Sequence, residues 1–171
     1  EGRLLFKELL IGVTRFFRDP EVWEQLGDEL IPELCAGRPE GGQLRAWTPA
    51  CSTGEEAYSL AIVFRETLDR LQLPGKLTLQ IFATDLDQDA IEKARTGRYP
   101  ANIAADVSEP RLQRFFVATD HGFELRKEIR EMVVFAPQNL IMDPPFTKLD
   151  FVTCRNLLIY FSSELQRTVL S

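Results

Sequence analysis

Three acidic residues stand directly after the two segments of the sequence that look most like buried strands. Glu55 and Glu56 follow the stretch LRAWTPACSTG, in which an apolar run ends in a glycine turn, and Asp85 follows the run LTLQIFAT. A strand, a glycine turn and a helix are also the first elements of nucleotide-binding folds. The turn of those folds presents free backbone N–H groups to a phosphate, whereas two carboxylates here would repel one. The pattern therefore favours a ligand that carries positive charge and no phosphate.

A carboxylate at the end of the second strand predicts a ribose in that ligand. Asp85 occupies the position from which an acidic residue accepts hydrogen bonds from a ribose diol. The separation of Gly54 from Asp85 is longer than the roughly 20 residues of the dinucleotide-binding fingerprint, so NAD is disfavoured. S-adenosylmethionine combines an adenosine with a sulfonium and an ammonium group, and it is the cofactor that we infer from these acids.

Each of these acids also has a purely structural interpretation. Asp85 could cap the helix that follows it. Thr53 and Glu56 have the Thr-x-x-Glu spacing of a helix capping box, and Ser52 and Glu55 have the equivalent spacing. The spacing alone leaves both interpretations open.

A proline motif offers a different methyl-transfer chemistry. The sequence DPPF, from Asp143 to Phe146, matches the Asp/Asn-Pro-Pro-aromatic motif of methyltransferases that act on amino groups of adenine or glutamine. In those enzymes the motif follows the fourth strand, where its polar group meets the target nitrogen. Here the segment predicted as the fourth strand, LDFVTC, comes after DPPF. A proline turn between two elements is therefore favoured, and amino-group methylation is the less favoured alternative.

Composition and the remaining reactive residues argue against several other functions. The 171 residues are enough for one domain, and a formal net charge of −6 argues against broad nucleic-acid binding. The chain has a single histidine, His121, so any scheme with a histidine base would depend on that residue. No run is as long as a membrane span, and the three cysteines, Cys35, Cys51 and Cys154, lack the spacing of a metal site. We therefore expect a protein of the reducing cytoplasm, without a metal and without membrane insertion.

The elements that would position these residues alternate between strands and helices. Apolar periodicity and capping residues predict helices at 3–11, 20–35 (with a bend or an end near Pro32), 54–72 and 88–95, strands at 44–51, 77–84 and 149–154, and a final helix capped by Ser162 or Ser163. Between residues 115 and 135, short alternating runs predict an antiparallel hairpin that leads into a third buried strand. This alternation predicts an α/β fold with a parallel sheet, whose ligand lies at the carboxyl ends of the strands.

Five segments together resemble the CheR-type chemoreceptor glutamate O-methyltransferases. They are VTRFFRD (13–19), ACSTGEEAYSLA (50–61), IFATDLDQDAIEKARTGRY (81–99), QNLI (138–141) and TCRNLLIYF (153–161), in the order of the family. The resemblance implies a Rossmann-like class I S-adenosylmethionine methyltransferase sheet with a small inserted antiparallel β-subdomain at about 100–132. It also implies that 1–19 are the remnant of a helical N-terminal domain, that 20–171 form a truncated methyltransferase domain, and that the C-terminal strands are missing.

The same resemblance assigns roles to individual residues. Arg18 and Tyr160 would line the reacting end of the site as catalytic residues. Gly12 stands where the family often has an asparagine, so one cofactor contact is expected to be lost. The cofactor-binding residues that the resemblance implies are Thr14, Arg18, Glu56, Asp85, Asn139, Leu140, Asn156 and Leu157.

The activity that the resemblance implies is methyl transfer from S-adenosylmethionine to glutamate side chains of bacterial chemoreceptors, which forms methyl esters. A glutamate carboxylate is ionised at pH 7, so this reaction needs no general base, and the scarcity of histidine agrees with that. The expected partner is the cytoplasmic domain of a chemoreceptor, and fusion to other chemotaxis domains is one interpretation of the fragment. The alternative is a degenerate domain that binds the cofactor as a sensor or scaffold without turnover.

Overall fold

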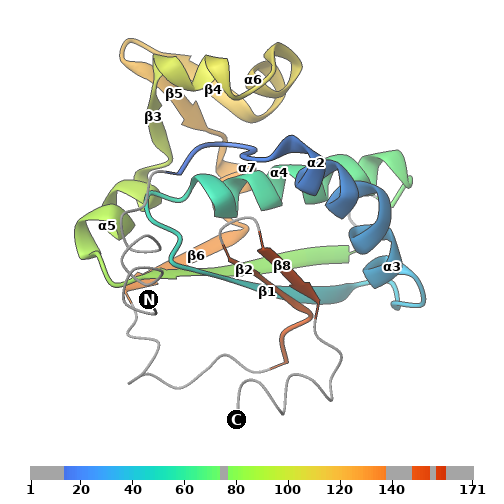
Figure 1. The fold of residues 1–171 in the computed structure, drawn as a ribbon. Coiled ribbons are helices and arrows are strands. Elements are labelled where there is room, and N and C mark those ends of the chain that lie inside the picture. The colour runs from blue at the N-terminus through green and yellow to red at the C-terminus, as the bar shows by residue number, and fades with distance from the viewer. Residues whose placement is uncertain (1–13, 74–76, 138–147, 155–156, 161–171) are drawn as a thin grey trace.

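The computed structural model describes residues 14–73, 77–137, 148–154 and 157–160, and Figure 1 shows their arrangement. The described part consists of a five-stranded sheet, a long helix across one of its faces, and a three-stranded sheet beyond that helix. The predicted helix at 3–11, the DPPF sequence and the part of the predicted final helix after residue 160 lie outside the described residues.

A mostly parallel sheet forms the centre of the structure. Its strands are β1 (Gly42–Pro49), β2 (Leu77–Asp85), β6 (Val133–Pro137), β7 (Phe151–Cys154) and β8 (Leu157–Tyr160), in the spatial order β6–β2–β1–β7–β8. The strands β2 and β7 each run parallel to β1, and β6 runs parallel to β2. Because β2 lies on one side of β1 and β7 on the other, the topological switch point is at β1, as the expected fold requires.

The strand β8 occupies residues that the sequence predicts as the start of the final helix. It pairs antiparallel with β7, and Cys154 lies opposite Leu157. Only Arg155 and Asn156 separate the two strands, whereas parallel neighbours need a crossover of about a dozen residues or more. The chain must therefore turn back on itself, and the sheet is mixed at this edge.

The helix α4 (Glu55–Arg70) covers one face of the central sheet and confirms the helix predicted at 54–72. Alternate residues of β1 and β2, among them Leu44, Ala46 and Ile81, are buried in the same core cluster as Leu60 and Phe64 of α4. This packing fixes the start of α4 against the carboxyl ends of the two strands.

The helical segment before β1 changes its form just before Pro32, where the sequence predicts a bend or an end. The helix α2 (Pro20–Gln25) continues into a π-helical turn (Leu26–Leu30) and then into α3 (Ile31–Cys35). Pro32 has no N–H to donate to the carbonyl group four residues earlier, and the wider turn accommodates that loss. The segment remains packed on the core through Trp23 and Leu26.

The chain between α5 (Gln88–Thr96) and β6 forms a second, antiparallel sheet. Its strands are β3 (Arg98–Pro100), β4 (Phe116–Thr119) and β5 (Gly122–Leu125), in the order β3–β5–β4. They are accompanied by a 3-10 turn (Ala101–Ala105) and by the helices α6 (Glu109–Phe115) and α7 (Lys127–Arg130). The predicted hairpin is confirmed as β4 and β5, whereas β3 is not predicted by the sequence. In Figure 1, α4 lies between this small sheet and the central sheet.

Candidate functional site

Residues 50–54, between β1 and α4, form a tight turn held to the end of β2. Ala50, Ser52 and Gly54 have positive φ angles of 53°, 52° and 95°. The Cys51 N–H donates to the Thr84 carbonyl oxygen at 2.9 Å, which ties the turn to the carboxyl end of β2. Positive φ costs free energy for residues other than glycine, so contacts from outside the turn must hold this conformation.

Asp85 joins the ends of the first two strands. Its Oδ2 accepts the Ser52 N–H at 2.8 Å, and its Oδ1 accepts the Asp87 N–H at 2.9 Å. The interpretation of Asp85 as a helix cap is wrong, because the Asp87 carboxylate caps α5 and accepts from the N–H groups of Asp89 and Ala90. Each carboxylate oxygen of the half-buried Asp85 keeps a further lone pair, so it can also accept hydrogen bonds from ribose hydroxyls.

Neither predicted capping box forms at the start of α4. Gly54, in a left-handed conformation, is the N-cap residue, so neither Ser52 nor Thr53 occupies the capping position. The Thr53 hydroxyl instead donates to the Glu55 carboxylate, and the Glu56 side chain is buried. Acids in the first turn complement the helix dipole, which explains part of their presence but not the burial of Glu56.

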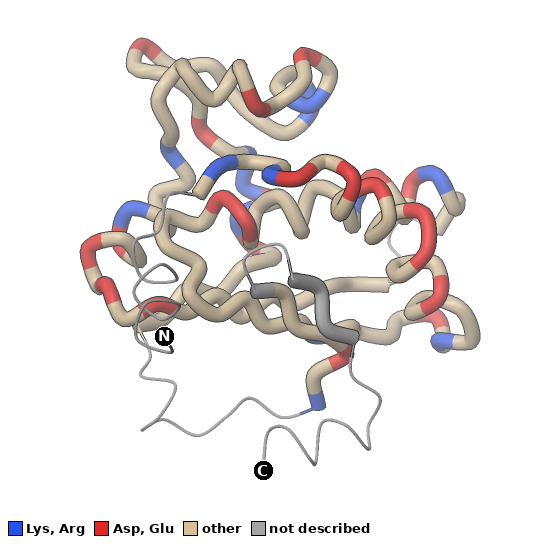
Figure 2. The backbone as a smooth tube through the Cα atoms, in the orientation of Figure 1, with Lys and Arg blue, Asp and Glu red and all other residues tan. Residues whose placement is uncertain are grey.

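Three carboxylates beside this turn raise the pKa of the same group, the Cys51 thiol. Burial raises the pKa of the Cys51 thiol, and the negative charge of Asp85 raises that pKa further. Glu56 and Glu55 act on the same thiol in the same direction. Burial also raises the pKa of Glu55 itself. We call Glu55, Glu56 and Asp85 around Cys51 the acidic edge. Its negative charge suits a cationic ligand and repels a phosphate. Figure 2 shows the acidic first turn of α4 directly after the turn that follows β1.

The segment that contains Arg18 is fixed beside the first two turns of α4. The Phe17 N–H donates to the Ser59 hydroxyl at 3.0 Å, and that hydroxyl donates to the Glu55 carbonyl oxygen at 2.7 Å. The Trp23 indole N–H donates to the Arg18 carbonyl oxygen at 2.8 Å. The Arg18 side chain is exposed, and its backbone adjoins the residue that bonds to Ser59 of α4.

Tyr99 and Ser59 are structural members of the site that the sequence analysis does not single out. The buried Tyr99 hydroxyl donates to the Thr53 carbonyl oxygen at 2.6 Å, and its ring meets Phe16 edge-on at a centroid distance of 4.9 Å. Burial raises the pKa of Tyr99 well above its ordinary value, so the hydroxyl remains a hydrogen-bond donor. Both residues lie inside segments that carry the family resemblance, and that is the signal by which they could have been found.

The predicted site residues differ in how far the structure describes them. Three lie at the turn after β1 or beside the first turns of α4, namely Arg18, Glu56 and Asp85. Thr14 is half-buried at the start of the described chain. Three predicted site residues lie outside the described residues: Asn139, Leu140 and Asn156. Two others on β8 are described only by their backbone, Leu157 and Tyr160.

The four parallel strands end at the same edge of the sheet. Pro137, the last residue of β6, lies opposite Asp85 at the end of β2. Val152 of β7 lies opposite Trp47 of β1, so these two strands also finish level with each other. Asn139 and Asn156 follow the ends of β6 and β7 in the sequence, as expected of residues around a site at this edge.

Other chemistries that the sequence leaves open gain no support from the described residues. His121 is exposed in the turn between β4 and β5. No three His, Cys, Asp or Glu side chains in the described ranges are placed to hold a metal ion. DPPF precedes β7, the strand beside β1, instead of following it. Within the same ranges, no helix is both long and apolar enough to cross a membrane.

Comparison with known proteins finds one matching family, and the relatives include chemotaxis protein methyltransferases. Residues 12–171 match the family described as "CheR methyltransferase, SAM binding domain". An uncharacterised 104.1 kDa protein of Rhodobacter capsulatus is 47% identical over 167 residues, which are 97% of this chain and 17% of that protein. The chemotaxis protein methyltransferase Cher2 of Pseudomonas putida is 38% identical over 92% of this chain and 58% of its own length. The chemotaxis protein methyltransferase of Escherichia coli is 33% identical over 99% of this chain and 58% of its own length, so the chain spans little more than half of these two relatives.

Proposed function

The chain belongs to the CheR methyltransferase family, and on this basis we propose that the protein methylates glutamate side chains of bacterial chemoreceptors. The reaction transfers a methyl group from S-adenosylmethionine, the cofactor of the family, to a carboxylate oxygen. The products are a glutamate methyl ester and S-adenosylhomocysteine. The glutamate substrate and the receptor partner are the finer part of the proposal, and they come from the sequence resemblance.

The observation that carries the proposal is the acidic edge around Cys51. S-adenosylmethionine has no phosphate, and its sulfonium and ammonium groups are positive. Attraction between these charges and partly buried carboxylates is stronger than it would be in water. A dinucleotide would bring its pyrophosphate against the same carboxylates, so the residues present fit S-adenosylmethionine better than NAD.

The residues of this edge would divide the binding of the cofactor between them. Asp85 would accept hydrogen bonds from the ribose hydroxyls, and Glu56 would attract the cationic end. When bound, the cofactor supplies a methyl group made electrophilic by the positive sulfur atom. The further cofactor contacts in the proposal come from the resemblance and are Thr14, Asn139, Leu140, Asn156 and Leu157.

The chain's own residues would contribute position rather than acid–base chemistry. The substrate carboxylate is already ionised at pH 7 and needs no base. The fork of donors on the Arg18 guanidinium matches a carboxylate, either that of the substrate or that of the cofactor's amino-acid tail. Tyr160 would shape the channel through which the methyl group passes. Holding the reacting atoms close and in line then supplies most of the rate.

Calorimetric titration of the full-length protein with S-adenosylhomocysteine, beside an Asp85→Ala variant, tests the cofactor site. Each lost hydrogen bond costs about 1 kcal/mol, so we expect the variant to bind roughly tenfold more weakly or worse. Asp87→Ala is the matched control, because that neighbouring carboxylate caps α5. Equal losses in the two variants, or no binding by the folded wild type, would contradict the site.

Transfer of a labelled methyl group to the cytoplasmic domain of a chemoreceptor tests the substrate. We expect label that mild base releases as methanol, because carboxylate methyl esters hydrolyse under these conditions. Label that resists base would instead indicate methylation of an amino group. Cofactor binding without any transfer would support the degenerate sensor or scaffold.

A further inference from the structure

The backbone on both sides of Arg18 is strained. Phe17 has a φ angle of 52° and Asp19 has one of 54°, in the left-handed region that residues with a Cβ seldom adopt. A residue held there costs free energy and persists only where its surroundings hold it firmly. The conformation of this short segment therefore depends on contacts from elsewhere in the molecule.

Part of that support comes from the N-terminal elements and α4. The hydrogen bond from the Phe17 N–H to Ser59 holds the backbone before Arg18, and the bond from Trp23 to the Arg18 carbonyl oxygen holds it afterwards. The rings of Phe17 and Trp23 also meet edge-on, with their centroids 6.2 Å apart. These contacts fix the backbone on both sides of Arg18 and pack Trp23 against the Phe17 ring.

The other support comes from Arg111 of α6, in the inserted segment. Its guanidinium carbon lies 3.9 Å from the centre of the Phe17 ring. The same guanidinium donates two hydrogen bonds to the Glu66 carboxylate of α4, from Nε to Oε2 at 3.0 Å and from Nη2 to Oε1 at 2.8 Å. A planar, two-pronged pair of this kind fixes the orientation of the stacked group and would not be reproduced by a lysine.

The Phe17 ring and Arg111 border an open cleft. The cleft lies between α2, the π-helical turn, α4 and α6, and Phe17, Trp23, Glu66 and Arg111 all line it. Removal of the guanidinium would leave the face of the Phe17 ring open to the cleft. A stacked, partly desolvated cation of this kind stabilises the ring that it covers, and its loss would remove support from the strained backbone.

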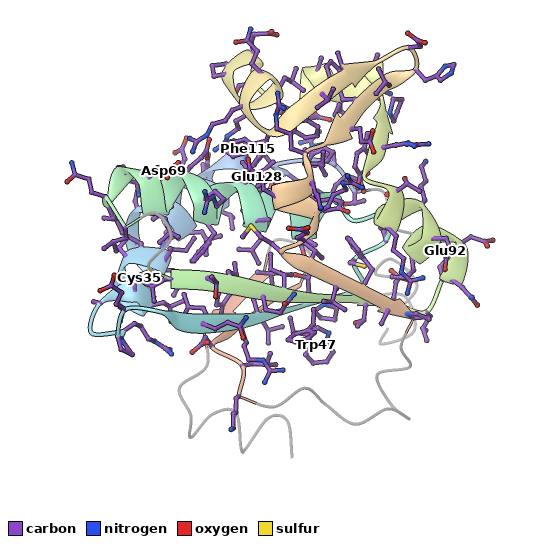
Figure 3. The ribbon with its side chains drawn as sticks, turned by 180° about the vertical axis from the view of Figure 1, so that it is seen from behind. Cys35, Trp47, Asp69, Glu92, Phe115 and Glu128 are labelled. Atoms are coloured by element: carbon purple, nitrogen blue, oxygen red, sulfur yellow. The ribbon has the colours of Figure 1, made fainter. Side chains whose placement is uncertain are left out.

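A second arginine of the same helix shows that joining α6 to α4 does not require this arrangement. Arg114 forms an ion pair with Asp69 of α4, and its guanidinium lies 4.8 Å from the ring centre of Phe115 rather than against Phe17. Figure 3 labels Asp69, which belongs to α4, and Phe115, the last residue of α6. Arg114 thus links the same two helices without contacting the segment that carries Arg18.

We propose that Arg111, held by Glu66, is a positioning residue that keeps the strained segment around Arg18 in the conformation the methyl-transfer site requires. The inference rests on the proposed function, because it takes Arg18 to contact the substrate or the cofactor. It adds a direct link from the inserted segment to the reacting end of the site.

A double-mutant cycle in the full-length protein tests this role. We expect Arg111→Ala to lower the turnover of receptor methylation about tenfold, because a displacement of about 1 Å in a catalytic group can cost up to a hundredfold. In an Arg18→Ala background the same substitution should change turnover less than twofold. Arg114→Ala is the matched control, with a similar change in melting temperature and less than a twofold change in turnover.

Two results would overturn the proposal. One is an Arg111→Ala loss of the same factor in both backgrounds, since Arg111 would then act independently of Arg18. The other is an equal loss of turnover in Arg111→Ala and Arg114→Ala, which would indicate only a structural link. If the wild type transfers no methyl group to receptors, the proposed function fails separately, and the cycle is measured as affinity for S-adenosylhomocysteine. An Arg111→Ala affinity equal to wild type would then overturn the inference.

Discussion

Glu55 keeps a charge in a place that water reaches poorly. Burial raises the pKa of this carboxyl above its ordinary value, and the Thr53 hydroxyl and Lys93 only partly oppose the rise. Because the folded-state pKa is raised, the stability that Glu55 contributes is complete below the ordinary glutamate pKa, near pH 4, and is lost as the pH rises through the raised value. At neutral pH the ionised carboxylate therefore destabilises the fold when no cation is bound beside it.

We expect Glu55→Gln to raise the melting temperature at pH 7.5 and to leave it close to the wild-type value at pH 4. Glutamine keeps the shape and an oxygen that can accept from Thr53, and it removes the charge. Thermal unfolding at the two pH values measures the difference. Glu21→Gln is the control, because Glu21 also lies in the first turn of a helix but is exposed. A Glu55→Gln variant that melts below the wild type at pH 7.5 would show that the fold already compensates this charge.

The sequence predicts which acids could form the site, but not how they are held. Asp85 and Glu56 are identified because they follow strand ends, and that depends only on local pattern. The cap of α5 is Asp87 rather than Asp85, a difference of two positions that spacing did not decide. The positive φ angles of Ala50 and Ser52 have no local signal, since residues with a Cβ rarely adopt them. They arise from bonds to β2, which is distant in the sequence.

At the scale of elements, the turn between β1 and α4 depends on the absence of a side chain at Gly54. Its φ angle is 95°, and a Cβ there would lie 3.0 Å from the Ala94 Cβ and 3.0 Å from the Phe135 ring. The start of α4 therefore packs directly against α5 and β6. This close approach joins the three elements whose ends surround the acidic edge.

We expect Gly54→Ala to lower the free energy of unfolding by roughly 2–5 kcal/mol, since the left-handed conformation costs about 1–2 kcal/mol and overpacking adds about 1–3. Gly41→Ala is the control, because Gly41 has a similar φ of 84° with nothing within 4 Å of the added carbon. Urea unfolding of both variants separates the two contributions. Equal losses would mean that the close packing of Gly54 is not needed.

Long, periodic elements could be predicted from the sequence, whereas short ones set by pairing could not. The predictions at 54–72 and 77–84 correspond to Glu55–Arg70 and Leu77–Asp85, because each has many buried positions at one period. The strand β3 has three residues, too few for a pattern, and exists because it pairs with β5. The reversal at β8 depends on a connection of two residues, whereas the sequence predicts a helix in the segment that begins at Leu157, and that prediction is wrong for 157–160.

At the scale of the whole molecule, the acidic edge connects to both the N-terminal segment and the inserted sheet. Tyr99 bonds to Thr53 in the turn and packs on Phe16, while Phe17 bonds to Ser59 on α4. These contacts join segments that are more than 40 residues apart in the sequence. A ligand that holds the turn closed should therefore also steady the segment around Arg18.

Hydrogen exchange of the full-length protein measures that coupling directly. We expect saturating S-adenosylhomocysteine to slow amide exchange at 16–19, 50–56 and 85–87, and to leave the loop at 36–41 unchanged. A ligand that binds only the closed form lowers the population of the open form by the factor 1 + [L]/Kd, so at 100 times Kd the protection rises about a hundredfold. That loop precedes the amino end of β1, whereas the acidic edge follows the carboxyl end, which makes the loop an internal reference.

The pattern of protection also distinguishes the acidic edge from the cleft beside α2. That cleft is lined by Trp23, Asp28 and Arg70 among others, and a ligand within it would protect residues 22–28 rather than 50–56. The Asp85→Ala variant should lose the protection at all three segments together, because the ligand is then absent from the edge at the same concentration. Protection confined to 50–56 and 85–87 would show that the cofactor binds at the strand ends without steadying Arg18. In that case the link through Phe17 would serve the fold alone, and the reacting end of the site would have to be organised by other residues.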